Sequence, residues 1–166
     1  MIRKSVSYLL IFFGSVLLLS VTSCVDQVKK AEREEQALIS SYIANNPDLA
    51  FEKKSSGLYY LEVQAGQGRF AVKNDTAYMK YVGKLLNGTE FYSTYDSNDT
   101  TFVRAIKEGQ LILGLVEGLT YMQEGGHAIF LIPSYLAYGS TGYYFPGYTP
   151  VIFEVALVAL KEGLGK

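Results

Sequence analysis

The hydrophobic pattern divides the chain into three segments with different periods. An almost uninterrupted apolar run covers residues 8–19. A helical pattern follows: residues 29–37 are charged helix formers, and apolar residues then recur at helical spacing until Pro47. Beyond Gly57 the pattern changes to short runs of strand-forming residues that are separated by turns.

The third segment predicts five or six strands and one short helix. The predicted strands cover residues 58–63, 75–85, 90–95, 101–106, 127–132 and 151–160. The dipeptide Asn87-Gly88 between the second and third strands is typical of a hairpin turn. Residues 110–122 predict the helix, because three leucines in this stretch share one face. We therefore expect a small α+β domain in which a sheet wraps one helix.

The length of 166 residues suffices for one domain and an appendage. We expect a signal peptide over residues 1–23, a lipidated cysteine with a helical tether over 24–56, and the folded domain over 57–166. The charged run of the tether indicates a solvated helix face. The alternative for the tether is a dimerisation or docking helix.

The N-terminal segment has the layout of a bacterial secretory leader. Arg3 and Lys4 precede the apolar run, which is shorter than the roughly 20 residues that a membrane-spanning helix needs. Small residues follow, and the sequence Val-Thr-Ser-Cys that ends at Cys24 resembles a bacterial lipobox. We expect Cys24 to carry a lipid that anchors the protein in the bacterial cell envelope. The sequence does not specify which membrane holds the lipid or on which side the protein lies. The alternative is a plain signal peptide or uncleaved anchor, with Cys24 incidental.

Composition and charge exclude several classes of function. The net charge is −1 with the leader, and removal of Arg3 and Lys4 makes it −3, so no basic excess points to nucleic acid. The single cysteine and the single histidine, His127, exclude a cysteine-rich zinc site and a multi-histidine metal site. We therefore expect no metal and no cofactor. The 14 tyrosines and 9 phenylalanines, which lie mainly after residue 57, point to an aromatic site instead.

Five motifs, in order and with matching spacing, resemble the FKBP-type peptidyl-prolyl cis-trans isomerases. They are Tyr81-Val82-Gly83 with Asn87-Gly88, Phe91 and Ser93; Phe102 with Leu111-Ile112, Gly114 and Glu117-Gly118; residues 132–139; Phe145-Pro146; and residues 151–155. The resemblance runs from about Gly57 to Leu160, which is essentially the whole domain. It implies a half-barrel of five to six antiparallel strands around one short helix, with an aromatic cleft between them.

The resemblance also implies the site. By position, the catalytic residues are Tyr81, Phe91, Ile112, Tyr138 and Phe153. The substrate-binding residues are Phe102, Leu111, Leu115, Tyr143 and Phe145. The backbone N–H of Ile112 and the hydroxyl of Tyr138 are the expected hydrogen-bond donors. The implied partners are proline-containing segments of exported proteins.

The residue types agree with that chemistry. Rotation about an X-Pro bond is slow because amide resonance opposes it, with a barrier of roughly 18–20 kcal/mol. The twisted transition state is less polar than either planar form, so an apolar, water-poor pocket favours it. Neither a nucleophile nor a metal is needed.

Two departures from the family pattern affect the expected activity. Tyr92 stands where the family has an aspartate, and Leu115 stands where it has a tryptophan. The loop over residues 142–146 is also shorter and more aromatic. The leading hypothesis is an isomerase of reduced activity that helps exported proteins to fold. The alternatives are a non-catalytic module that binds proline-containing segments of an envelope partner, and a small barrel that binds an apolar ligand.

Overall fold

The computed structural model describes residues 26–95 and 101–163. Cys24 and the predicted signal peptide lie outside the described residues. Residues 26–45 are helical, in agreement with the predicted tether helix. The chain forms two compact units, Met1–Ala37 and Leu38–Lys166, and the second holds all the strands. No helix among the described residues is long and apolar enough to cross a membrane.

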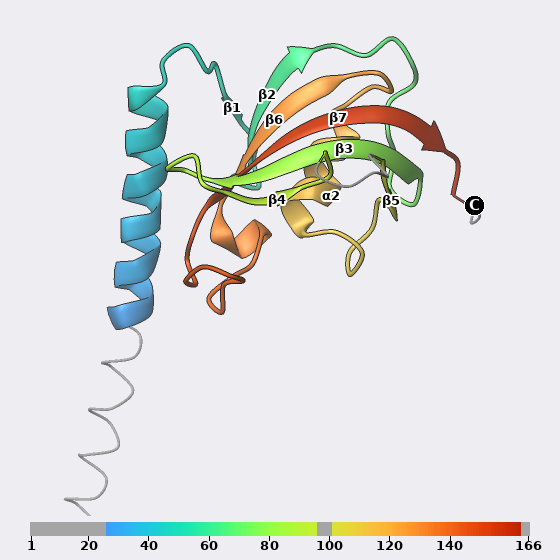
Figure 1. Cartoon of the computed structure of the whole chain (residues 1–166). Coiled ribbons are helices and arrows are strands. Elements are labelled where there is room, and N and C mark those ends of the chain that lie inside the picture. The colour runs from blue at the N-terminus through green and yellow to red at the C-terminus, as the bar shows by residue number, and fades with distance from the viewer. Residues whose placement is uncertain (1–25, 96–100, 164–166) are drawn as a thin grey trace, which may run out of the picture. The chain divides into compact units, whose positions relative to one another are not determined.

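The second unit is built on an antiparallel sheet of seven strands (Figure 1). The strands are β1 (Glu52–Lys53), β2 (Tyr59–Gln64), β3 (Thr76–Leu85), β4 (Glu90–Ser93), β5 (Phe102–Ala105), β6 (His127–Ile132) and β7 (Val151–Lys161). Their order is β1-β2-β6-β7-β3-β4, and β5 also pairs with β3. The expected α+β architecture is confirmed, with β1 as a strand that the sequence pattern did not predict.

Strand β3 organises the part of the sheet that carries the candidate site. One edge of β3 pairs with β7 along its whole length. The other edge pairs with β5 through Thr76–Met79 and with β4 through Val82–Lys84. Strands β4 and β5 therefore follow one another along the same edge, and aromatic residues of both lie near the middle of β3.

Helix α2 (Leu113–Thr120) packs inside the curve of the sheet (Figure 1). Its buried residues Leu115 and Leu119 join a core cluster that includes Phe130 of β6 and Phe153 of β7. Gly118 is needed for this packing, because a Cβ atom there would lie 2.6 Å from the Phe130 ring. The helix is shorter than the predicted span of 110–122, since its N-cap residue Ile112 is extended.

A second core cluster lies on the opposite face of the sheet. Tyr59, Leu131 and Ile152 are each next in sequence to a residue of the first cluster, and neighbouring strand residues point to opposite faces. Ile39 covers them and is 1% exposed. Residues 38–56, which the sequence assigns to the tether, therefore add Ile39 and β1 to the unit that holds the sheet.

Candidate active site

A cavity of about 230 Å³ opens between the curved sheet and the start of helix α2. It is lined by Tyr81, Tyr92, Phe102, Gln110, Leu111, Ile112, Leu115, Tyr138, Tyr143 and Phe153. Eight of these ten are site residues expected from the sequence. The cavity is the aromatic cleft that the resemblance implies.

The inner walls of the cleft are made by rings of β3, β5 and β7. Tyr81 meets Phe102 edge to face at a centroid distance of 5.2 Å, and it contacts the ring of Phe153 at 5.5 Å. Leu115 and Phe153 are 3% and 2% exposed, so little of the floor is accessible to water. Such packing holds the wall rings in fixed orientations.

Phe91 and Phe145 are expected site residues that do not line the cavity. They lie behind its wall, with their ring centroids 5.0 Å apart and that of Phe91 6.0 Å from that of Tyr138. Gly83 makes room for this layer, because a Cβ atom there would lie 2.8 Å from the Phe91 ring. The structure thus places Phe91 and Phe145 as supports of Tyr138 rather than as cleft surface.

The loop over residues 139–148, which contributes Tyr143 to the cleft, is held by a hydrogen bond between its two ends. The N–H of Tyr148 donates to the carbonyl oxygen of Gly139 at 3.0 Å, and Gly142 adopts a φ of +73°. A Cβ atom at Gly142 would lie 2.1 Å from a backbone oxygen, so only glycine fits there. This turn stacks Tyr143 on Tyr138 at a centroid distance of 5.1 Å.

Two polar groups on the cleft wall are available to a ligand. Ile112 is the extended N-cap residue of α2, and no backbone carbonyl of the described residues accepts its N–H. The Tyr138 hydroxyl also donates to no described residue. Burial raises the pKa of Tyr138 to about 12, followed by smaller effects of Tyr143 and Tyr92, so its proton stays in place at neutral pH.

Tyr92 is the cleft residue whose contacts the sequence did not predict. Its ring stacks on that of Tyr81, with the centroids 5.2 Å apart and an angle of 17° between the ring planes. Burial raises the pKa of Tyr81, and the neighbouring Tyr92 raises it further. A stacked pair of tyrosine rings therefore occupies this wall.

Gln110 is the other lining residue that sequence reasoning missed. It is exposed, and it belongs to no motif and to no apolar stripe. Its position directly before Leu111 and Ile112 is the one signal that pointed toward the cleft. The expected site residues themselves converge, with eight on the cavity surface and two behind it.

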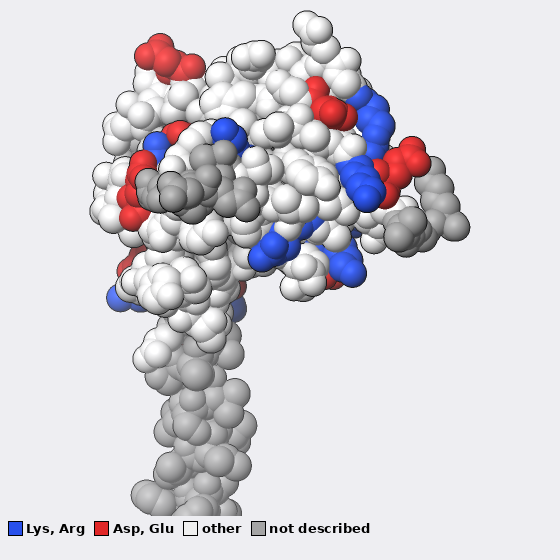
Figure 2. All heavy atoms as spheres, turned by 45° about the vertical axis from the view of Figure 1, so that its right-hand side comes forward, with Lys and Arg blue, Asp and Glu red and all other residues white. Residues whose placement is uncertain are grey.

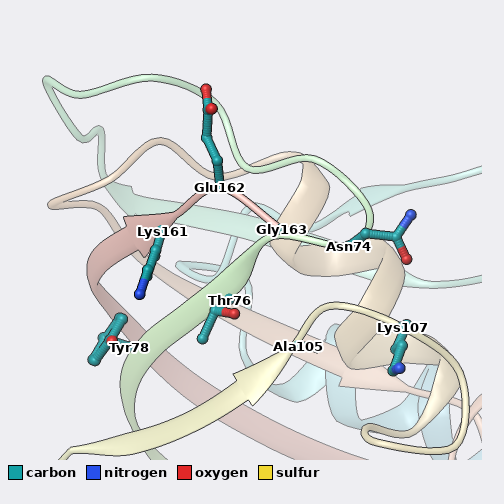
Figure 3. Close-up of a pocket in the computed structure, with 8 residues that line it drawn as sticks. All are labelled: Asn74, Thr76, Tyr78, Ala105, Lys107, Lys161, Glu162 and Gly163. Atoms are coloured by element: carbon teal, nitrogen blue, oxygen red, sulfur yellow. The ribbon is translucent and has the colours of Figure 1, made fainter. Parts of the chain in front are cut away.

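A larger hollow of about 500 Å³ lies elsewhere, at the far ends of β3, β5 and β7 (Figure 3). Its lining includes the charged residues Lys107, Lys161 and Glu162, and Figure 3 shows Lys107 and Lys161 apart, with Thr76 and Ala105 between them. On the face shown in Figure 2, basic and acidic side chains are interspersed. No group of three metal-ligating side chains occurs within residues 26–95 and 101–163. The aromatic cleft is therefore the candidate site.

The cleft suits a small, mostly apolar ligand with a carbonyl group. Its aromatic rings can enclose a saturated five-membered ring, and the Tyr138 hydroxyl and the Ile112 N–H can donate to carbonyl oxygens beside it. No described lining residue carries a charge, so a transition state with reduced polarity is favoured over a polar ground state.

Comparison with known proteins agrees with this geometry. The family model for FKBP-type peptidyl-prolyl cis-trans isomerases matches residues 67–158. The isomerase FkpA of Buchnera aphidicola from Acyrthosiphon pisum is 36% identical over 141 residues, which are 83% of this chain and 57% of that protein. The macrophage infectivity potentiator of Trypanosoma cruzi is 31% identical over 160 residues, or 89% of this chain and 80% of that protein.

A solved structure supports the same relationship. The crystal structure of FkpA from Escherichia coli superposes with a TM-score of 0.67 at 28% sequence identity. The match covers 80% of this chain and 63% of that one. The chain spans about half the length of the Buchnera FkpA relatives that it matches.

Proposed function

The chain belongs to the FKBP-type peptidyl-prolyl cis-trans isomerases, and we propose that it accelerates X-Pro isomerisation in its aromatic cleft. The observation that carries the proposal is the convergence of Tyr81, Phe102, Ile112, Tyr138 and Phe153 on one cavity. These residues come from five separate parts of the sequence. A purely structural core would not need to leave a cavity between them.

In this proposal the walls and the donors have different tasks. The rings of Tyr81, Phe102 and Phe153 seat the proline ring and exclude water. The Ile112 N–H and the Tyr138 hydroxyl hold the carbonyl groups on either side of the proline. As the C–N bond twists it loses charge separation, so the apolar cleft stabilises the twisted form relative to the planar ones.

The cellular role that we propose is help in folding exported proteins. The test is the refolding of a protein whose slow phase is limited by X-Pro isomerisation. We expect the rate of that phase to rise in proportion to the concentration of the full chain. An unchanged slow phase, with the added chain folded, would remove the folding role.

The second candidate function is a binding module for proline-containing segments. It is favoured by Tyr92 and Leu115, which replace the aspartate and the tryptophan of the family pattern. Titration with a proline-containing peptide separates the two functions. Saturable binding without faster cis-trans exchange indicates a binding module, whereas both together indicate an enzyme.

We also propose that Cys24 carries a lipid and anchors the protein in the bacterial cell envelope. The support is the leader of basic, apolar and small residues that ends at Cys24. Growth with a labelled fatty acid should label the protein, and Cys24→Ser should abolish that label. Equal labelling of both forms would exclude lipidation at this residue.

A further inference from the structure

The described walls of the cleft are electrically neutral. Four of the ten lining residues are tyrosines, one is a glutamine and the rest are apolar. Burial raises the pKa of Tyr81 and of Tyr138, which keeps both phenols protonated. A substrate carboxylate would therefore meet no negative charge on these walls.

One cation lies at the rim of this neutral site. Arg104 is exposed, and its guanidinium carbon lies 4.3 Å from the centroid of the Phe102 ring. Phe102 is itself a cleft wall two residues earlier on β5, so both side chains are on the same side of that strand. The guanidinium thus extends the cleft wall outward as a charged edge.

The positive charge at the rim is not balanced by the described surroundings. Arg104 forms no ion pair with a carboxylate of residues 26–95 or 101–163, and its Nη1 donates to the Val103 carbonyl oxygen at 2.8 Å. Arg104 is also the one charged group among the influences on Tyr81, whose pKa it slightly lowers. Its guanidinium therefore lies beside a ring that lines the cleft.

We propose that the cleft prefers proline-containing segments with an acidic residue directly adjacent to the proline. This inference rests on the proposed isomerase function and assigns Arg104 as its specificity-determining residue. A carboxylate next to a seated proline ring gains an ionic contact with Arg104, and the neutral phenols of the wall do not repel it. A lysine in the same place is disfavoured by the like charge.

The test compares cis-trans exchange in short peptides catalysed by the full chain. The residue before or after the proline is Glu, Gln, Lys or Leu, and the efficiency kcat/KM is measured for each. We expect Glu to exceed Gln by roughly two- to fivefold in at least one position, as is usual for one solvent-exposed ion pair. The preference should shrink at high salt because screening weakens exposed pairs.

Arg104→Gln should bring the ratio of kcat/KM for the Glu peptide to kcat/KM for the Gln peptide down to about one, whatever its activity toward the Leu peptide. Lys53→Gln is the matched control, since Lys53 is also an exposed cation on a strand. Its Nζ lies 5.2 Å from the centroid of the Tyr59 ring. This substitution removes the same charge outside the cleft and should keep the preference. Tyr92→Asp introduces a carboxylate into the wall and should shift the preference from Glu toward Lys.

The outcomes separate this inference from the function on which it rests. If the Leu peptide is accelerated but Glu equals Gln in both positions, the selectivity is wrong and the isomerase function stands. If Glu is preferred equally by wild type and by Arg104→Gln, Arg104 is not its cause. If a folded sample accelerates no peptide, the proposed function fails and the selectivity fails with it.

Discussion

Tyr138 both lines the cleft with its ring and offers it a hydrogen-bond donor through its hydroxyl. Its ring is held between Tyr143, which stacks on it, and the supporting rings of Phe91 and Phe145. Its hydroxyl is left to donate, with a pKa raised by burial to about 12. The ring therefore contributes to packing, whereas the hydroxyl forms no hydrogen bond with a described residue.

We expect Tyr138→Phe to lower kcat/KM for X-Pro isomerisation by roughly two- to tenfold, the effect of one hydrogen bond of about 0.5–1.5 kcal/mol. The ring contacts remain, so the free energy of unfolding should change little. Both quantities are measured on the same sample, by peptide exchange and by urea denaturation. Unchanged kinetics in the folded variant would show that the hydroxyl does not contact the substrate.

Leu115 forms part of the floor of the cleft, and the size of its side chain should affect catalysis. It is a buried aliphatic residue beside a cavity of about 230 Å³. Leu115→Trp should raise kcat/KM by roughly two- to tenfold, because an aromatic contact with the proline ring adds about 0.5–1.5 kcal/mol. Leu115→Ala, which enlarges the floor, should lower it. A folded tryptophan variant with unchanged activity would show that the floor does not limit catalysis.

At the scale of elements, the helical segment before the sheet also packs against it. Ile39 is 1% exposed and packs on Tyr59, Leu131 and Ile152 on the face of the sheet opposite the cleft. Its neighbour Leu38 is 57% exposed. The helical residues 38–45 thus bury Ile39 against the sheet, with Tyr42 and Ile43 packed on the same cluster, and leave Leu38 in solvent.

Ile39→Ala should destabilise the sheet unit by about 2–5 kcal/mol, the usual loss for a buried aliphatic side chain. Leu38→Ala is the matched control and should cost under about 0.5 kcal/mol, as exposed substitutions do. Urea denaturation followed through tyrosine fluorescence measures both. Equal midpoints for the two variants would mean that this helical segment does not stabilise the sheet.

The elements that the sequence predicts well are those with a long regular pattern. The run of residues 127–132 is a strand over that span, and residues 151–160 are a strand that extends to Lys161. Strand β1 escapes prediction because Glu52-Lys53 is too short and too polar to show alternation, and only its pairing with Tyr59-Tyr60 makes it a strand. The helical stripe that contains Ile39 is visible in the sequence, but the surface that covers it is not.

The candidate site likewise has some features that the sequence predicts and others that depend on how the strands pair. Its aromatic members are predictable because they lie in motifs with a known order and spacing. The contact between Tyr92 and Tyr81 is not, since it depends on the register of β4 on β3, in which Tyr92 pairs with Gly83 beside a register shift. The second-layer position of Phe91 and Phe145 is likewise a matter of side-chain direction, which no sequence period specifies.

At the scale of the whole molecule, the tyrosines make stability depend on alkaline pH. Burial raises the pKa of Tyr60 and of Tyr138 in the folded state to about 12, from an ordinary value of 10. Below about pH 9 both groups are neutral in the folded and unfolded chain alike. As the pH rises from 10 to 12 the unfolded chain loses these protons first, so the free energy of unfolding falls.

We expect the free energy of unfolding to show no tyrosine-dependent change from pH 7 to about pH 9 and to decrease steeply above pH 10. Tyr60→Phe should make that decrease shallower, because it removes one of the groups that ionise. Urea denaturation at a series of pH values measures the slope for both proteins. Identical slopes would contradict a raised pKa at Tyr60.

The proposed function requires that the aromatic cleft itself accelerates X-Pro isomerisation. The most direct measurement is exchange between the cis and trans signals of a Leu-Pro peptide at equilibrium, recorded by NMR with catalytic amounts of the full chain. The exchange rate should rise linearly with protein concentration and should fall for Tyr138→Phe. A folded chain that leaves the exchange rate at its uncatalysed value would contradict this expectation, and so would an acceleration that Tyr138→Phe retains in full.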